Sequence, residues 1–170
     1  MARNIEVKAR VDSVADVMPR ARALAHEDAQ LIRQDDTFFR VPHGRLKLRE
    51  LADGSAELIH YLRADTLEAK LSDHRRVPVA DAAALREALQ RALGLLGRVR
   101  KQRWLLLAGQ TRIHLDRVDG LGDFIELEVV LRDGQSVADG VRVAEGLMHE
   151  LGLARAERIP GAYLDLLTPA

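Results

Sequence analysis

Charged side chains recur at every second position in several segments of this chain, and most of them are basic. Lys47 and Arg49, for example, alternate with Leu46 and Leu48. Alternate side chains of a β-strand point to the same face of a sheet, so each such segment would have one charged and one apolar face. The basic members of the pattern are Lys8, Arg45, Lys47, Arg49, Arg63, Lys101 and Arg103, and the acidic members are Glu6, Asp116, Glu126 and Glu128.

Alternating charge on a single strand is most often a solvated sheet face. Two features favour a binding site here. Most of the expected strands carry charged residues at every second position, on one face. Most of these residues are basic, whereas a merely soluble surface mixes both signs. Clustered cations repel one another unless an anion lies between them. The pattern therefore predicts an anion site, and a cationic surface with a few carboxylates suits a polyanion held together with a divalent metal.

Composition narrows the class of protein. The 170 residues include 26 basic and 26 acidic side chains, for a formal net charge of +0, which argues against a general nucleic-acid or membrane binder. The absence of cysteine excludes disulfides, zinc–thiolate sites and a thiol nucleophile. No apolar run is long enough to span a bilayer, and the N-terminal stretch lacks an apolar signal segment. We expect one domain over residues 1–170, located in the cytoplasm.

The same alternation predicts the elements that must position the charged side chains. About eight strands are expected, over residues 3–11, 31–41, 45–49, 57–63, 67–79, 98–107, 111–118 and 124–131. Helices are expected from Asp16, from Asp81 with an end near Gly97, and from Ser136 with Gly152 just past its end. Asp16 is preferred to Ser13 as the first cap because proline at position 19 is best tolerated in a first turn. Residues 163–167 form a short closing segment.

These elements predict an α+β fold. Short turns between strands indicate an antiparallel sheet, and closing the sheet into a barrel removes its exposed edges. The amphipathic helices need an apolar sheet surface to cover. The helices are therefore expected outside the barrel, against its apolar face, and the charged face is expected inside.

Four segments resemble motifs of a known family. Asn4-Ile5-Glu6-Val7-Lys8 is similar to the Glu-x-Glu-x-Lys signature of the CYTH superfamily, also called triphosphate tunnel metalloenzymes. Residues 44–50 (GRLKLRE), 99–103 (VRKQR) and 124–128 (FIELE) resemble its later motifs, in the family's order. His114-Leu115-Asp116 fits the strand that precedes the last of these motifs, which carries the pair of glutamates. The resemblance covers nearly the whole chain, and the ordered set is more specific than any single motif.

The resemblance implies an eight-stranded antiparallel β-barrel, or tunnel, that binds a triphosphate with Mg²⁺ or Mn²⁺ as cofactor. Members include class IV adenylyl cyclases, thiamine triphosphatases, inorganic triphosphatases and RNA triphosphatases. The expected partner is therefore a small triphosphate compound such as ATP, thiamine triphosphate or tripolyphosphate. No nucleic acid and no membrane is expected as a partner, and a homodimer is compatible with the sequence.

The resemblance also assigns roles to the charged side chains. The arginines suit paired hydrogen bonds to phosphate, and the lysines suit point-charge contacts. The triphosphate-binding set is Lys8, Arg45, Lys47, Arg49, Arg63, Lys101 and Arg103. Carboxylates supply the hard oxygens that Mg²⁺ and Mn²⁺ prefer, and the metal-binding set is Glu6, Asp116, Glu126 and Glu128. Asp116 and Glu126 fit the alternative role of internal ion-pair partners equally well.

One position departs from the family signature. Asn4 stands where the signature has its first glutamate, so an oxygen ligand is kept but its charge is lost, which weakens a second metal site or the activation of a water. The preferred reaction is that of a class IV adenylyl cyclase, which converts ATP to cyclic AMP and pyrophosphate. The alternatives are a triphosphatase, which hydrolyses thiamine triphosphate or inorganic triphosphate, and a non-catalytic binder of polyphosphate or nucleotide. No residue is assigned as the catalyst.

Overall fold

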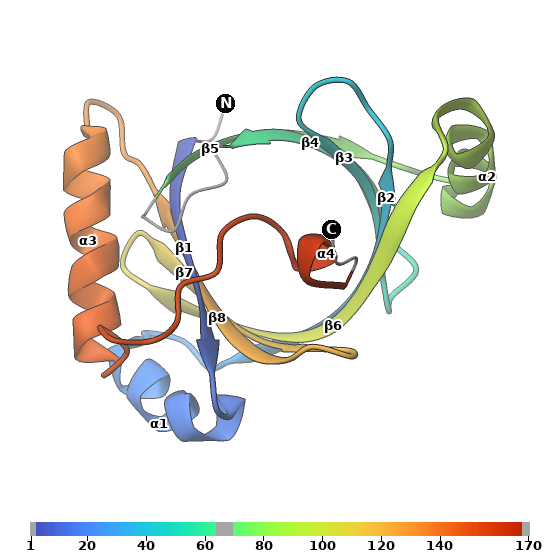
Figure 1. The fold of residues 1–170 in the computed structure, drawn as a ribbon. Helices are drawn as coiled ribbons and strands as arrows, with labels where there is room; N and C mark the ends of the chain where they lie inside the picture. Colours follow the sequence, from blue (N-terminus) through green and yellow to red (C-terminus); the bar gives the residue numbers. More distant parts are fainter. Residues whose placement is uncertain (1–2, 64–69, 168–170) are drawn as a thin grey trace.

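Eight antiparallel strands close into a barrel in the structure, a computed structural model that describes residues 3–63 and 70–167, without the side chains of residues 63 and 70–72. Around the barrel the strands follow the order β1-β5-β4-β3-β2-β6-β7-β8 (Figure 1). The strands are β1 (Arg3–Val11), β2 (Gln30–Phe39), β3 (Arg45–Leu51), β4 (Ala56–Arg63), β5 (Lys70–Pro78), β6 (Leu95–Ala108), β7 (Thr111–Val118) and β8 (Gly122–Val130). The predicted barrel is confirmed, and residues 67–69 of the expected fifth strand lie outside the described residues.

Four helices accompany the barrel in the described part of the chain: α1 (Val14–Leu24), α2 (Ala82–Leu93), α3 (Val137–Glu150) and α4 (Tyr163–Leu167). The expectation that Asp16 caps α1 is wrong. Ser13 Oγ accepts from the N–H of residue 15 at 3.0 Å, and Asp123 Oδ2 accepts from the Val14 N–H at 2.8 Å. These two oxygens satisfy the first free donors of the helix, so α1 begins earlier and Pro19 lies inside it.

The end of α2 also differs from the expectation. The helix stops at Gly94, which has a φ of +85°, and β6 begins directly afterwards at Leu95. Glycine adopts this backbone conformation at little cost. Gly97, the expected stop, instead lies within β6, where a β-carbon would collide with the side chain of Leu164. Its missing side chain lets the C-terminal segment approach the barrel wall.

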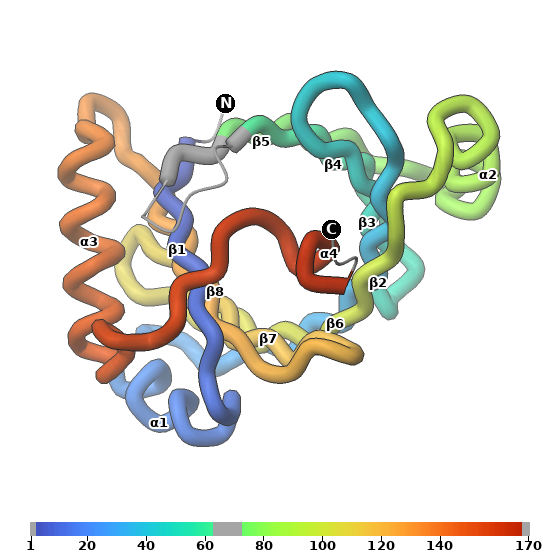
Figure 2. Tube along the Cα trace, in the orientation of Figure 1, coloured from blue at the N-terminus to red at the C-terminus, as the bar shows by residue number. Residues whose placement is uncertain are grey.

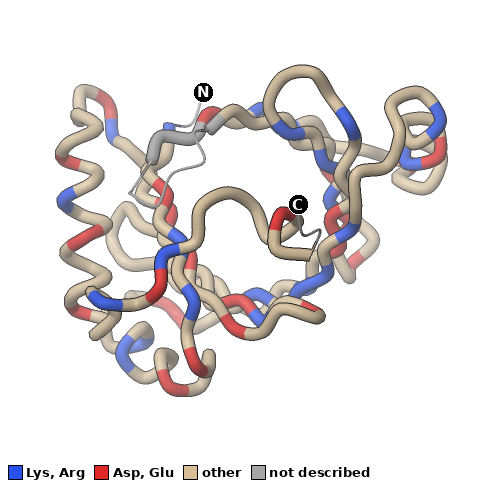
Figure 3. The backbone as a smooth tube through the Cα atoms, viewed as in Figure 1, with Lys and Arg blue, Asp and Glu red and all other residues tan. Residues whose placement is uncertain are grey.

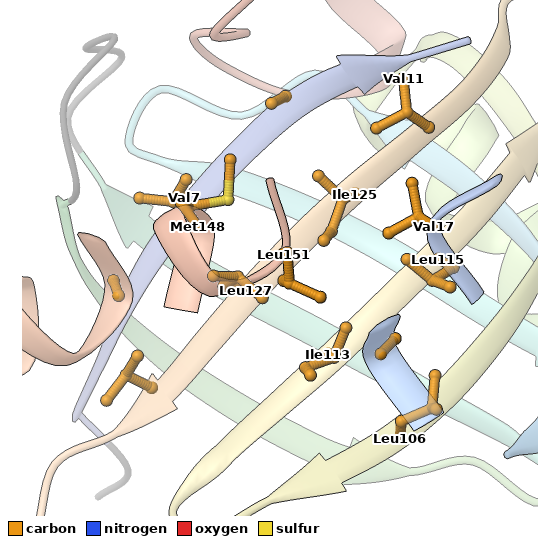
Figure 4. Packing of buried hydrophobic residues seen from close by; sticks show 14 of the residues in the cluster. Val7, Val11, Val17, Leu106, Ile113, Leu115, Ile125, Leu127, Met148 and Leu151 are labelled. Carbon is orange, nitrogen blue, oxygen red and sulfur yellow. The ribbon is translucent and has the colours of Figure 1, made fainter. Parts of the chain in front are cut away.

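The main apolar core lies outside the barrel, as the alternation predicts. Buried side chains from β1, β7 and β8, such as Val7, Ile113 and Leu127, pack against α1 and α3 (Figure 4). Met148 is the corresponding contact from α3. Each fully buried aliphatic side chain of this size contributes roughly 1.5–3 kcal/mol to stability. This core holds one side of the barrel wall in place and leaves its inner face to the charged residues.

The fourth helix lies in the mouth of the barrel rather than against its outer wall. The chain after α3 crosses the opening, and α4 sits within the ring of strands (Figures 1 and 2). Its buried residues Tyr163 and Leu164 pack with inward side chains that include Phe38, Ile59 and Phe124. One end of the barrel interior is therefore apolar and filled by α4. Within the described residues, no helix combines the length and apolar character needed to cross a membrane.

A pair of glycines in α3 provides a test of the packing. A β-carbon on Gly140 would lie 2.5 Å from Leu131 Cδ2 and 2.6 Å from Ile5 Cγ1, whereas one on Gly146 meets nothing within 4 Å. We expect Gly140→Ala to lower the free energy of unfolding by about 1–3 kcal/mol through overpacking. Gly146→Ala, the matched control, should raise it by about 0.5–1 kcal/mol. Urea unfolding followed by circular dichroism measures both, and equal effects would contradict the packing of α3 on β1.

Candidate functional site

The inward charged side chains surround one cavity of about 60 Å³ inside the barrel. Basic and acidic positions both occur around the barrel wall (Figure 3). The basic lining residues are Lys8, Lys47, Arg49, Arg76, Lys101 and Arg103, and the acidic ones are Glu6, Asp36, Glu126 and Glu128. The alternation along the strands explains why these charged side chains line the interior, because the same strands bury their apolar side chains on the outer face.

Asp36 organises the wall formed by β2, β3 and β6. Its two oxygens accept from Arg49 Nε at 2.8 Å and Nη2 at 2.7 Å, and Oδ2 also accepts from Lys47 Nζ at 3.0 Å. Lys101 Nζ lies 3.7 Å from Oδ2. Burial opposes ionisation, but these cations hold the pKa of Asp36 well below its usual range. One carboxylate thus faces three cationic groups, which leaves this wall positively charged.

Asp116 organises a second wall, between β6 and β7. Arg103 donates to its two oxygens from Nε and Nη2, both at 2.7 Å, and the Tyr163 hydroxyl donates to Oδ2 at 2.7 Å. Asp116 is fully buried. Although burial alone would raise the pKa of this carboxyl, the charge and hydrogen bonds of Arg103 lower it to about 2. The pairing matches the alternative role of an internal ion-pair partner and fixes the Arg103 guanidinium in the wall.

Glu126 joins the two sides of the cavity. Lys8 Nζ lies 3.2 Å from Oε2, and His114 Nδ1 and Arg103 Nη2 lie 3.2 Å and 3.4 Å from Oε1. Despite burial, the charge of Lys8 and the contacts of His114 and Arg103 hold the pKa of Glu126 well below its usual range. Burial, followed by the charge of Arg103, lowers the pKa of His114. The His114 imidazole thus contacts Glu126 in a setting that disfavours its charged form.

A donor set that fits a divalent metal lies at the cavity wall, where Glu126 and Glu128 line the cavity and His114 lies beside them. His114, Glu126 and Glu128 each offer one ligand atom, and these atoms lie within 4.8 Å of one another. Glu6 stands directly opposite Glu128 in the β1–β8 pairing. Carboxylate oxygens suit Mg²⁺ and Mn²⁺, and an imidazole is a good ligand for many first-row transition metals. The chemistry of these residues is thus compatible with the metal that the sequence predicts.

Two residues of the predicted sets, Arg45 and Asp116, do not line the cavity. Arg45 lies at the barrel mouth, where Nη2 donates to Asp165 Oδ1 of α4 at 2.6 Å. Asp116 lies behind Arg103, with its oxygens already hydrogen-bonded. The side chain of Arg63 falls outside the described residues. The other predicted residues, Lys8, Lys47, Arg49, Lys101, Arg103, Glu6, Glu126 and Glu128, line the cavity together.

Sequence reasoning missed several lining residues. Asp36 follows Asp35, so both faces of β2 carry an aspartate at this point and the alternation does not single out either one. Arg76 stands in a run of charged residues, Asp73-His74-Arg75-Arg76, which hides the parity in the same way. Tyr163 reaches the cavity from a helix that follows the last strand by more than thirty residues.

Comparisons with known proteins agree with this fold. A family model described as "CYTH domain" matches residues 2–163. The PH1012 protein of Pyrococcus horikoshii OT3 has a similar structure, with a TM-score of 0.85 and 24% identity over 96% of this chain and 98% of that chain.

Two other solved structures carry names that refer to an activity. A Vibrio parahaemolyticus protein, provisionally named an adenylate cyclase, gives a TM-score of 0.80 and 21% identity over 98% of each chain. HpAC1 of Hippeastrum, provisionally named an adenylyl cyclase and described with a dominant triphosphatase activity, gives 0.65 and 16% over 90% and 89% of the two chains. At these identities the likeness concerns the fold. The search among curated proteins gave no match.

Proposed function

The chain belongs to the CYTH domain family, and on this premise we propose that it is a metal-dependent enzyme that binds the triphosphate end of its substrate inside the barrel and cleaves a bond within it. The observation that carries the proposal is the single cavity around which Lys8, Lys47, Arg49, Lys101 and Arg103 gather. Phosphoryl transfer requires chiefly that the phosphate charge be positioned and neutralised, and this lining offers both paired and single donors.

The electrostatics of the cavity favour a polyanion. Burial, and then the positive charge of Arg103, hold the pKa of Lys101 well below its usual range. Burial and the charge of Arg49 lower the pKa of Lys47 from 10.5 to about 8. Both shifts express the cost of crowding cations away from water. A triphosphate would relieve that cost because it brings several negative charges to the same groups.

Glu126 and Glu128, with His114 beside them, are the residues that would hold Mg²⁺ or Mn²⁺, and Glu6 lies across the wall from Glu128. The metal would supply further neutralisation of the phosphate oxygens. The protein's own residues have the remaining tasks. Arg103, fixed by Asp116, and Arg49, fixed by Asp36, would bind and orient the phosphates. The barrel wall would limit the access of water.

Two reactions fit this arrangement. In the cyclase reaction, the ribose 3′-hydroxyl of ATP attacks the α-phosphorus and pyrophosphate leaves. In the triphosphatase reaction, water attacks the γ-phosphorus, the diphosphate part of the substrate is the leaving group, and the γ-phosphoryl group is released as orthophosphate. The small cavity and the filling of the apolar end by Tyr163 and Leu164 favour hydrolysis. A nucleoside needs an apolar or aromatic surface of its own, whereas a triphosphate and a water need only the charged part.

A panel of substrates tests the proposal. The protein would be incubated with tripolyphosphate, thiamine triphosphate and ATP, each with Mg²⁺ or Mn²⁺, and the products separated by chromatography. Release of phosphate is the expected result, and cyclic AMP with pyrophosphate would instead identify the cyclase reaction. Binding of tripolyphosphate without turnover of any substrate would identify a non-catalytic binder and refute the proposed enzyme.

The pKa of Lys47 predicts how binding depends on pH. Lys47 must be charged to attract phosphate, so the affinity for tripolyphosphate should be highest below pH 8 and fall as the pH rises through that value. The expected loss approaches tenfold, or about 1.4 kcal/mol, per pH unit at most. Calorimetry at pH 7, 8 and 9 measures it. Lys47→Arg keeps its charge over this range and should make the profile less steep, with the contribution of Lys101 remaining; a wild-type profile no steeper than that of the variant would contradict the assignment.

A further inference from the structure

Glu128 is held by two donors that share one of its oxygens. Asn4 Nδ2 donates to Oε1 at 2.6 Å, and Arg112 Nη1 donates to the same atom at 3.0 Å. The strand register fixes both contacts. Arg112 stands directly opposite Glu128 in the β7–β8 pairing. In the β1–β8 pairing Asn4 stands opposite Val130, one diagonal step from Glu128.

The arrangement depends on an amide at position 4. A carboxylate at the same distance from Glu128 would repel it unless a cation lay between the two groups. The Asn4 amide donates a hydrogen bond instead, in a position that is only 2% exposed. Arg112 adds the positive charge of its guanidinium. Glu128 is thus neutralised on its Oε1 side by the chain itself.

The other side of Glu128 remains suited to a metal. Oε2 lies 4.0 Å from His114 Nε2, within the group formed by His114, Glu126 and Glu128. Asn4 Oδ1 is buried and has no hydrogen-bond partner among the described residues. This atom is a neutral acceptor beside the carboxylates, able to accept a hydrogen bond from a water of a metal's hydration shell. The two sides of Glu128 therefore differ: one is closed by built-in donors and one is open to a cation.

We propose that Asn4 and Arg112 together replace a second divalent ion at Glu128, so that the barrel holds one metal ion and uses the Arg112 guanidinium as a fixed cation beside it. In two-metal sites the ions lie about 3.5–4 Å apart and together stabilise the attacking and leaving oxygens. In this barrel the donors of Asn4 and Arg112 would take the place of one of the two ions. The inference rests on the proposed function for its link to triphosphate, but the metal count can be measured without a substrate.

The test is a Mn²⁺ titration of the full chain, followed by the electron paramagnetic resonance signal of the free ion, without and then with tripolyphosphate. The wild type is expected to bind one Mn²⁺ per chain, and the double variant Asn4→Glu with Arg112→Gln is expected to bind two. Arg112→Gln alone alters only a half-exposed side chain, and it should bind Mn²⁺ about tenfold more tightly because the repulsion between the ion and a nearby positive charge is gone. Arg117→Gln is the matched control, since Arg117 lies on the same strand with 53% of its side chain exposed and pairs with Asp123.

The outcomes separate this inference from the proposed function. A wild type that binds two ions or none, a folded double variant that still binds one, or an Arg112→Gln affinity equal to that of Arg117→Gln would each overturn it. If the counts follow the expectation while tripolyphosphate fails to bind, the inference stands and the proposed function fails. Circular dichroism establishes that each variant is folded before its count is used. A double variant that does not fold leaves the decision to the wild-type count and to Arg112→Gln.

Discussion

Replacing Arg103 with methionine is expected to lower the free energy of unfolding by about 3–5 kcal/mol, because it leaves a buried carboxylate without its cation. Asp116 is fully buried and receives two hydrogen bonds at 2.7 Å from Arg103. The Tyr163 hydroxyl alone cannot compensate the charge. Urea unfolding at pH 7, followed by circular dichroism, measures the loss.

Controls connect this loss to the ion pair. Arg100→Met removes an arginine of the same strand whose side chain is 58% exposed and bound to Asp35, and it should cost only about 0–1 kcal/mol. Adding Asp116→Asn to Arg103→Met should recover part of the stability, because no buried charge remains. A loss that Asp116→Asn does not relieve, or equal losses for Arg100 and Arg103, would show that the pair does not stabilise the wall.

The same pair fixes the sign of a pH effect. The pKa of Asp116 is lowered to about 2 in the folded chain, below its value of about 3.9 in an unfolded chain. Its contribution to stability is therefore present above about pH 4 and is lost as the pH falls through about 2. In Arg103→Met the carboxyl can become protonated at a higher pH. The difference in stability between wild type and variant should consequently shrink on acidification.

Replacing Arg49 with glutamine is expected to weaken the binding of tripolyphosphate with Mg²⁺ by about 2–5 kcal/mol, or roughly 30- to 4,000-fold, the usual effect of truncating a buried charged hydrogen-bond partner. Arg49 is 6% exposed and its guanidinium is held in place by Asp36. Asp36 occupies the Nε and Nη2 side of the guanidinium, and the hydrogens of Nη1 and the second hydrogen of Nη2 suit phosphate oxygens. Isothermal titration calorimetry at pH 7 measures the change.

The matched control is Arg100→Gln. Arg100 binds Asp35 on the outside of the barrel, as Arg49 binds the adjacent Asp36 on the inside. The two variants lose the same charge, so nonspecific attraction of a polyanion should weaken about equally in both. If Arg49→Gln is folded and loses no more affinity than Arg100→Gln, Arg49 has no place in a triphosphate site.

Strand parity explains how much of the fold and site was predictable. Lys47 and Arg49 alternate with leucines, so a single rule placed them inside and the leucines outside. The rule fails where both parities carry charge, as at Asp35 and Asp36. It also gives the face of a strand but not the depth along the barrel. Arg45 has the same parity as Arg49, yet it reaches the mouth and binds Asp165 there.

The position of α4, which fills one end of the barrel interior, illustrates a different limit of prediction from the sequence. Residues 163–167 read as a short closing segment, and nothing in their own sequence indicates that they enter the barrel. Their place depends on distant features, among them the missing side chain of Gly97 and the hydrogen bond from Tyr163 to Asp116. Such contacts are set by the closed fold as a whole. Local patterns can predict α4 as an element but not what it fills.

The most direct test of the central claim is a crystal structure of the chain with Mn²⁺ and a non-hydrolysable triphosphate analogue. The account predicts three phosphorus positions inside the barrel, with phosphate oxygens within hydrogen-bond distance of Arg49 and Arg103, and one Mn²⁺ bound by Glu126 and Glu128. Phosphate density confined to the outer surface of the barrel, at concentrations that saturate binding in solution, would contradict it.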